Sequence, residues 1–128
     1  MSYYFSKTLA LGFEDTIRRT VEALKREGFG VITEIDLKET LKKKINVDFR
    51  NYRILGACNP TLAHEALQIE DKVGTMLPCN VVVQSTGDGN TEVAAIDPVA
   101  SMAAIDNPRL KAAAERVQLK LRNVVESL

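Results

Sequence analysis

Two cysteines stand in similar sequence surroundings, and they are the residues of this chain best suited to covalent or redox chemistry. Cys58 lies in the sequence Gly-Ala-Cys-Asn-Pro, and Cys79 lies in the sequence Leu-Pro-Cys-Asn. Each thiol comes where a strand-like run meets a loop, a position in which proteins often place reactive groups. If the two sulfurs meet, they can form a redox pair or bind a soft metal ion. The spacing between them matches no metal-binding or redox motif.

Cys58 has the stronger case for reactivity. Asn59 and Pro60 follow it and have the pattern of a helix start, in which the asparagine caps the helix and the proline is its first residue. The positive end of that helix would favour a thiolate at Cys58. The alternative is that Cys58 and Cys79 are small core residues, because free cysteines are among the most buried residue types.

Four polar side chains are candidates for binding a ligand: Asn59, Asn80, Glu34 and His64. His64 is the only histidine, so any imidazole base or metal ligand must be this residue, although a solvent-facing helical position is the simpler interpretation. Glu34 and Asp36 are two residues apart at the end of a predicted strand, so their side chains point to the same side. Two carboxylates placed together can do acid–base work or hold a hard cation. Asp36 also has the form of a helix cap, and Glu34 is a natural partner for Arg53.

The bulk composition describes an ordinary soluble protein with one domain, residues 1–128. Apolar residues make up 45% of the 128 residues and charged residues 27%. Because 17 basic residues balance 17 acidic ones, neither nucleic acid nor a membrane surface is expected as a partner. The chain shows no signal peptide and no bilayer-spanning apolar run, which predicts a cytoplasmic location and free thiols. No cofactor is predicted.

Hydrophobic periodicity predicts the elements that must position these residues. Strands are expected over residues 2–9, 29–35, 52–58 and 91–96, with a further strand around 81–83. Helices are expected over residues 13–26, 37–44, 60–70 and 110–128. Three pairs, Asn59-Pro60, Asp97-Pro98 and Asn107-Pro108, each mark a helix start. This order predicts a two-layer α+β domain, with two long helices on one face of a mostly antiparallel sheet and short inserted helices.

The second face of the predicted sheet is half apolar. Simple alternation along the strands assigns to it the residues Ile32, Leu55 and Val82 among Glu34, Arg53, Asn80 and Gln84. A face of this kind needs cover from the short helices or from a second subunit. A symmetric homodimer is the simplest expectation.

Several segments resemble one protein family. The run Tyr-Arg-Ile-Leu-Gly-Ala-Cys-Asn-Pro at residues 52–60 is similar to the family called domain of unknown function 302, as are residues 28–36, residues 77–81 and the pair Asp97-Pro98. The resemblance covers nearly the whole chain. It implies a β-α-β(4)-α core of the type grouped with TATA-binding-protein-like folds, in small prokaryotic proteins. It implies no reaction or ligand, and the fold alone licenses no claim of DNA binding.

Three functional hypotheses follow. The first is a non-catalytic or ligand-binding homodimer with a pocket near Cys58, Asn59, Cys79 and Asn80, where the asparagines and a helix N-terminus provide polar contacts, including contacts to a small anion. The second is a thiol-based redox enzyme or sensor, with Cys58 as the nucleophile and Cys79 as the resolving thiol. The third is a metal or haem binder that adds His64 to the two sulfurs.

Overall fold

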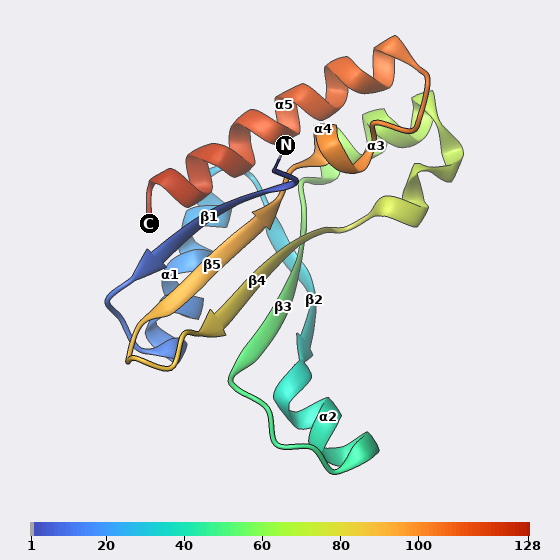
Figure 1. Ribbon diagram of the computed structural model, residues 1–128. Coiled ribbons are helices and arrows are strands. Elements are labelled where there is room, and N and C mark those ends of the chain that lie inside the picture. The colour runs from blue at the N-terminus through green and yellow to red at the C-terminus, as the bar shows by residue number, and fades with distance from the viewer. Residues whose placement is uncertain (1) are drawn as a thin grey trace.

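A five-stranded antiparallel sheet forms the centre of the computed structural model, which describes residues 2–128 (Figure 1). Its strand order is β1-β5-β4-β3-β2, and every neighbouring pair is antiparallel. The strands are β1 (Tyr4–Leu9), β2 (Gly30–Asp36), β3 (Tyr52–Cys58), β4 (Cys79–Ser85) and β5 (Thr91–Ile96). The predicted order of elements and the α+β class are confirmed.

Two long helices, α1 (Phe13–Arg26) and α5 (Pro108–Glu126), cover one face of this sheet (Figure 1). Their apolar sides meet the sheet in a single core that includes Leu24 of α1 and Leu121 of α5, both fully buried. Helix α1 ends because Gly28 adopts a left-handed φ of +84°. That turn lets the Phe29 N–H donate to the Leu24 carbonyl, which satisfies an end group of the helix and brings Phe29 into the core.

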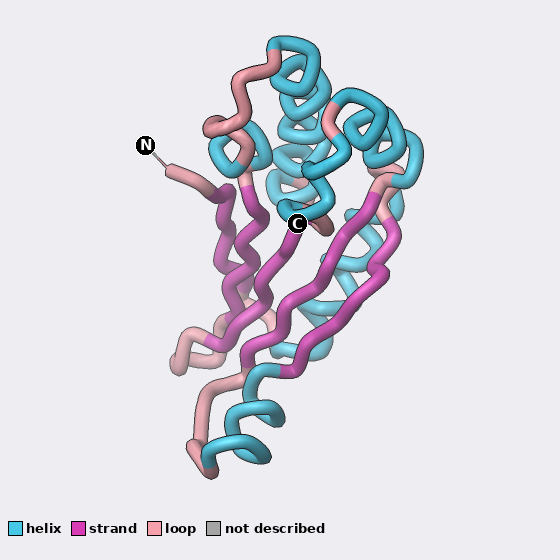
Figure 2. The backbone as a smooth tube through the Cα atoms, turned by 90° about the vertical axis from the view of Figure 1, so that its right-hand side faces the viewer, coloured by secondary structure: helices cyan, strands magenta, loops and turns pink. Residues whose placement is uncertain are grey.

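The remaining helices are short: α2 (Leu37–Ile45), α3 (Pro60–Ile69), the 3-10 helix η1 (Asp71–Met76) and α4 (Pro98–Ser101). Helices α3 and α4 pack with η1 against α5 around a second small core that contains Val73, Met102 and Leu110. Helix α2 lies apart, beyond the ends of β2 and β3, and buries none of its side chains (Figure 2). The sequence did not predict η1.

The strand register divides the sheet residues into two faces. The covered face carries residues such as Leu55, Val81 and Val93, which are fully buried beneath α1 and α5. The other side, called here the open face, consists of Tyr4, Ser6, Thr8, Thr33, Ile35, Tyr52, Ile54, Asn80, Val82, Gln84, Glu92, Ala94 and Ile96. Within residues 2–128, no helix covers the open face.

The assignment of Leu55, Arg53 and Glu34 to the second face is therefore wrong. Leu55 pairs with Val81 rather than with Val82, so it points toward the helices, and Arg53 shares its side of β3. In β2 the register shifts at a β-bulge between Val31 and Thr33, which ends the simple alternation there. As a result Glu34 lies opposite Leu55, on the covered side.

Candidate functional site

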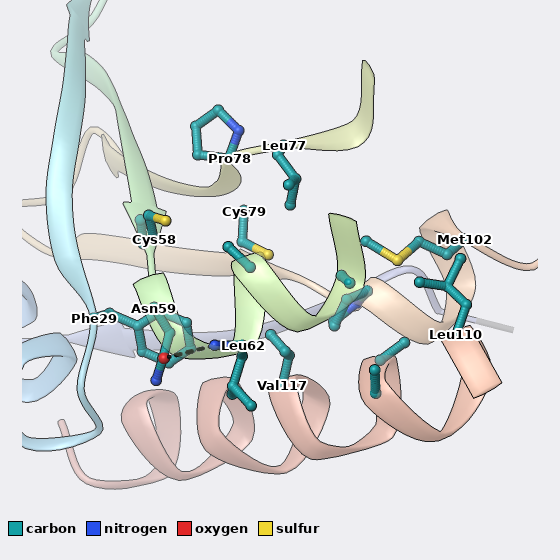
Figure 3. A pocket seen from close by; sticks show the side chains of 16 residues that line it. Phe29, Cys58, Asn59, Leu62, Leu77, Pro78, Cys79, Met102, Leu110 and Val117 are labelled. Atoms are coloured by element: carbon teal, nitrogen blue, oxygen red, sulfur yellow. Dashed lines mark hydrogen bonds between the residues drawn. The ribbon is translucent and has the colours of Figure 1, made fainter. Parts of the chain in front are cut away.

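A partly enclosed cavity of about 40 Å³ lies where the covered face meets α3 and the middle of α5 (Figure 3). Residues from β3, β4, α3, α4 and α5 line it, together with Phe29. Apart from Asn59 and the thiols of Cys58 and Cys79, every lining side chain is apolar. The apolar walls include Leu62, Leu77, Met102 and Val117, which Figure 3 shows around the two sulfurs.

The strand pairing brings the two cysteines to the same end of the sheet. Cys58 is the last residue of β3 and Cys79 is the first residue of β4. Ala57 pairs directly with Cys79, so Cys58 lies one position beyond that pair at the end of β3, and both cysteines line the cavity. Both are free thiols, and Cys58 is half-buried whereas Cys79 is buried.

Asn59 holds the start of α3 in place beside this cavity. Its Oδ1 accepts a hydrogen bond of 3.2 Å from the Leu62 N–H, which is the predicted cap. Its Nδ2 lies 3.5 Å from the Glu27 carbonyl, at the end of α1. A Cβ on Gly28 would come within 2.9 Å of that Nδ2, so the glycine makes room for the amide. Asn59 thus joins the end of α1 to the start of α3.

Burial controls the chemistry of Cys79. Its thiol is 6% exposed, and loss of solvation, with a smaller contribution from the neighbouring Cys58, raises its pKa to about 11. At neutral pH the Cys79 thiol is therefore protonated almost completely. Since the thiolate is the nucleophile, Cys79 is poorly suited to attack a substrate or a sulfenic acid.

The other predicted site residues lie away from the cavity. Asn80 follows Cys79 in β4 and so points to the open face. His64 is exposed on the outer side of α3, where its Nε2 lies 3.4 Å from the Nε2 of Gln68. Glu34 lies beside Arg53, toward the end of β2 that is farther from the cavity. The structure therefore brings together Cys58, Asn59 and Cys79, and separates the other three from them.

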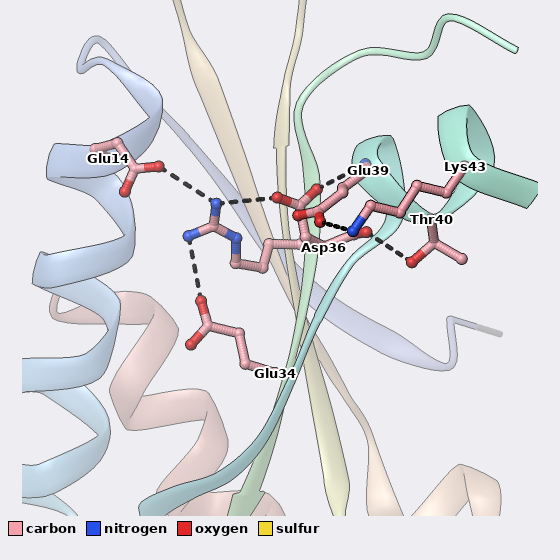
Figure 4. A network of polar contacts seen from close by, with 7 residues as sticks. Glu14, Glu34, Asp36, Glu39, Thr40 and Lys43 are labelled. Carbon is pink, nitrogen blue, oxygen red and sulfur yellow. Dashed lines mark hydrogen bonds and ion pairs between the residues drawn. The ribbon is translucent and has the colours of Figure 1, made fainter. Parts of the chain in front are cut away.

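Arg53 is the centre of a polar cluster that ties α1 to β2 (Figure 4). Its guanidinium lies 3.2 Å from Glu34, 3.4 Å from Glu14 and 3.6 Å from Asp36, and its side chain is only 19% exposed. The Phe13 ring packs beneath it, 5.3 Å from ring centroid to guanidinium carbon. Asp36 also caps α2 by accepting from the Glu39 N–H at 3.0 Å. The carboxylates considered for acid–base work or a hard cation thus have a structural cation partner.

Metal-binding geometry is not seen in the described chain. Among residues 2–128, no three His, Cys, Asp or Glu side chains come together in a way that could hold a metal ion. A haem or metal site that combined His64 with the two sulfurs would need the imidazole to reach the cavity. The position of His64 on the outer side of α3 does not support that arrangement.

Sequence reasoning missed a second hollow, which lies on the open face and has a volume of about 360 Å³. All three tyrosines of the chain, Tyr3, Tyr4 and Tyr52, line it, and Gln84 and Glu92 add polar groups. The alternation of Tyr52 with Ile54 signals a shared face. The contribution of Tyr3 and Tyr4 depends on the pairing of β1 with β5, which joins the two ends of the chain and leaves no local signal.

These features define a small two-layer α+β domain with an apolar cavity beneath one end of its sheet. Residues 5–128 match the sequence model of the family described as "Domain of unknown function DUF302", and the chain belongs to this family. It is similar over 98% of both chains to the crystal structure of an uncharacterized conserved DUF302 protein from Bacillus stearothermophilus, with 31% identity and a TM-score of 0.90. No curated protein shows significant similarity. The predicted family resemblance is confirmed, and these names indicate no specific function.

Proposed function

We propose that this chain is a non-catalytic binding module that works as a cytoplasmic homodimer and holds a small apolar group of a ligand in the cavity beside Cys58, Asn59 and Cys79. The observation that carries this proposal is the cavity itself, which several elements enclose with apolar side chains and one amide. Ligand sites in proteins are typically apolar hollows with a small number of polar groups that orient the ligand.

The size of the cavity decides what kind of group it takes. A volume of 40 Å³ has room for only a few water molecules. Pockets for drug-sized ligands are roughly 300–1,000 Å³. Only a group of a few heavy atoms therefore enters, and the rest of the ligand lies outside near the half-buried Cys58. An apolar group is favoured over an anion, because Asn59 already accepts from the Leu62 N–H at the start of α3.

The proposal contains no cofactor, no nucleic acid and no membrane partner. Equal numbers of acidic and basic residues support the absence of a polyanionic partner. Two free thiols support the cytoplasmic location. No helix among residues 2–128 has the length and apolar character to cross a bilayer. The β-α-β(4)-α order supports grouping the fold with TATA-binding-protein-like folds, and this grouping carries no functional inference.

A thiol-based redox sensor is the second candidate, because Cys58 and Cys79 line the same cavity from adjacent strands. In such a sensor the Cys58 thiolate attacks a peroxide and becomes a sulfenic acid with release of water, and the Cys79 thiolate then displaces a second water to form a disulfide. The raised pKa of Cys79 slows the second step. Loss of exactly one thiol pair under dilute peroxide, reversed by reductant and followed by mass spectrometry, would favour this candidate over the first.

Nuclear magnetic resonance with small apolar probes tests the proposed ligand cavity. Xenon and apolar molecules of a few heavy atoms, such as cyclopropane, are expected to shift the methyl resonances of Met102 and Val117 in the free protein. The variant Ala113→Val places extra atoms in the cavity, because Ala113 lines it and is 3% exposed. The variant Ala112→Val makes the same change at an exposed neighbouring position of α5 and serves as the control.

The expected result is that Ala113→Val abolishes the shifts and Ala112→Val preserves them. If the wild-type protein shows no shifts, or if Ala113→Val leaves them unchanged, the cavity is not a binding site and the proposal is wrong.

A further inference from the structure

The open face presents an apolar surface at the centre of the sheet. Ile54, Val82 and Ala94 lie side by side on the three central strands, in register with one another. Tyr52 and Ile96 extend this surface into the hollow lined by the tyrosines. No helix within residues 2–128 covers these side chains, although the residues that alternate with them on the same strands are fully buried. A broad apolar surface of this kind marks an interaction site.

A second uncovered apolar surface lies on the segment 37–51, which we call the arm. It comprises α2 and the chain that returns from α2 to β3 (Figure 2). Ile45 is 63% exposed and Val47 is 41% exposed. Helix α2 has nine residues and buries none of them, whereas isolated helices of this length are marginal in water and depend on packing for stability. Within one chain α2 contacts β2 and β3, and its Leu37 and Leu41 are only half-buried, whereas Ile45 and Val47 stay uncovered.

The arm and the open face form one continuous surface. Arg50 at the end of the arm donates from its Nε to the Oε1 of Gln84 on the open face, at 2.9 Å. The Arg50 guanidinium also stacks over the rings of Phe49 and Tyr52, with distances of 4.4 Å and 5.7 Å to the ring centroids. Tyr52 belongs to the open face, so the same arginine connects the two surfaces.

We infer that the open face and the arm together form a two-fold interface with a second copy of this chain, an inference that rests on the homodimer of the proposed function. The area of the surface supports the participation of both parts. Five strands about 4.8 Å apart and six residues of about 3.3 Å each make a sheet face of about 480 Å². A stable interface usually buries about 800 Å² of each partner. The sheet face alone falls short, and the exposed apolar residues of the arm supply further area.

The charges at the open face are compatible with a second copy of this chain. Gln84 accepts from Arg50 and donates to Glu92 at 3.2 Å, so the amide links the positive Arg50 of the arm to the negative Glu92 of the open face. A two-fold axis sets this surface against itself, and such a neutral pair is compatible with its own copy. Two of the four lysines of the arm are paired, Lys42 with Asp48 at 3.1 Å and Lys43 with Glu39 at 2.5 Å.

Sedimentation equilibrium and light scattering between micromolar and submillimolar protein concentrations test this interface. The wild-type protein is expected to be a dimer, and Val82→Arg, at the centre of the open face, is expected to be a folded monomer. Ile45→Arg, on the exposed arm, is expected to raise the dissociation constant at least tenfold. Leu119→Arg is the matched control, because Leu119 is also a large exposed apolar residue, 57% exposed on α5, but lies outside the proposed surface. It is expected to dimerise like the wild type.

Ile45→Arg provides a second test in case Val82→Arg does not fold, because Ile45 is not part of the core. A wild-type dimer that both variants leave intact would overturn the interface while the homodimer itself stands. A wild-type protein that stays monomeric at every concentration would overturn both. The xenon and fragment experiment tests ligand binding in the cavity separately, because it can be carried out on dimeric and monomeric variants alike.

Discussion

The two faces of the sheet differ in how deeply their side chains are buried within one chain. On the covered face, Leu55, Val81 and Val83 are fully buried by two long helices. On the open face, the residues that alternate with them, such as Ile54 and Val82, remain partly exposed. Both sets come from the same strands, so strand propensity cannot explain the contrast. The covered face provides the stability of the monomer, whereas the open face has apolar surface left for interaction.

The cavity belongs to the covered side and reflects its packing. It occurs at the end of the sheet, where the strands give way to α3 and the core of long helices meets the smaller core around Val73 and Met102. Apolar side chains, two thiols and the Asn59 amide line the space between these two cores. The open face instead offers a broad, shallow hollow lined by tyrosines. The two regions therefore suit different partners: a small apolar group and a large flat surface.

The largest expected difference in stability is between alanine substitutions of two neighbouring residues that lie on opposite faces of the sheet. Leu55→Ala is expected to lower the free energy of unfolding by about 3 kcal/mol, because it leaves a cavity in a fully buried site. Ile54→Ala is expected to cost about 1 kcal/mol at low protein concentration, where its side chain is partly solvated. Urea unfolding at two protein concentrations measures both. The cost of Ile54→Ala should rise at high concentration, and equal costs for the two variants would contradict the proposed contrast.

The second prediction concerns the alkaline stability that Cys79 controls. Its folded pKa of about 11 lies above the ordinary value of 9.0, so the folded state holds the thiol proton more tightly than the unfolded state. This contribution is complete below pH 9 and is lost as the pH rises through 11. The raised pKa corresponds to about 3 kcal/mol at most.

Unfolding of the wild type and of Cys79→Ala, compared between pH 8 and pH 11, measures this contribution. The wild type should lose more stability than Cys79→Ala over that range. Cys58→Ala should lose nearly as much stability as the wild type, because burial raises the pKa of Cys79 more than the neighbouring Cys58 does. Parallel curves for the wild type and Cys79→Ala would show that the Cys79 thiol is not shifted in the folded protein.

Local sequence signals predicted most of the fold. The strands at residues 52–58 and 91–96 have the predicted boundaries, because alternating apolar residues and flanking turns mark them. The three Asn-Pro and Asp-Pro pairs cap α3, α4 and α5 as predicted. Local signals also placed Cys58 and Asn59 at the junction of β3 and α3. Each of these features depends on residues that are close together in the chain.

The remaining features depend on long-range packing. The bulge between Val31 and Thr33 changes the register by one residue, and no local pattern announces it. Phe29 and Met102 line the cavity only because α1, α4 and α5 converge there. The arrangement of tyrosines on the open face needs β1 to pair with β5, and Arg53 meets Glu14 only after α1 folds over the sheet. Sequence alternation alone therefore assigned Arg53 to the wrong face.

The third prediction concerns Gly56, a closely packed position on the open side of β3. A Cβ on Gly56 would lie 1.9 Å from the Oγ1 of Thr33 and 2.7 Å from the Cγ of Pro78, whereas a Cβ on Gly30 would meet nothing within 4 Å. Gly56→Ala is expected to cost about 2 kcal/mol through this overlap, and Gly30→Ala to change stability by less than about 0.5 kcal/mol. Thermal unfolding measures both. Adding Thr33→Ala to Gly56→Ala should restore part of the loss, and no difference between the glycines would refute the overlap.

The smallest expected effect is at the arm. Asp36→Ala removes the side chain that accepts from the Glu39 N–H and caps α2. Because no side chain of α2 is fully buried, loss of this cap should lower the global free energy of unfolding by less than about 1 kcal/mol. Hydrogen exchange should nevertheless show faster exchange over residues 37–45. Asp36→Asn keeps a capping acceptor and gives up the charge that faces Arg53, so it should preserve most of this protection.

The dependence of this exchange on protein concentration sharpens the comparison between the two faces. If the arm packs on a second copy, raising the concentration of Asp36→Ala should restore protection over residues 37–45, while the strands of the covered face remain protected throughout. A global loss of stability as large as that of Leu55→Ala would instead mean that the arm supports the monomer core. In that case the apolar residues of the arm would have a role within one chain, and the open face would have to form the interface without them.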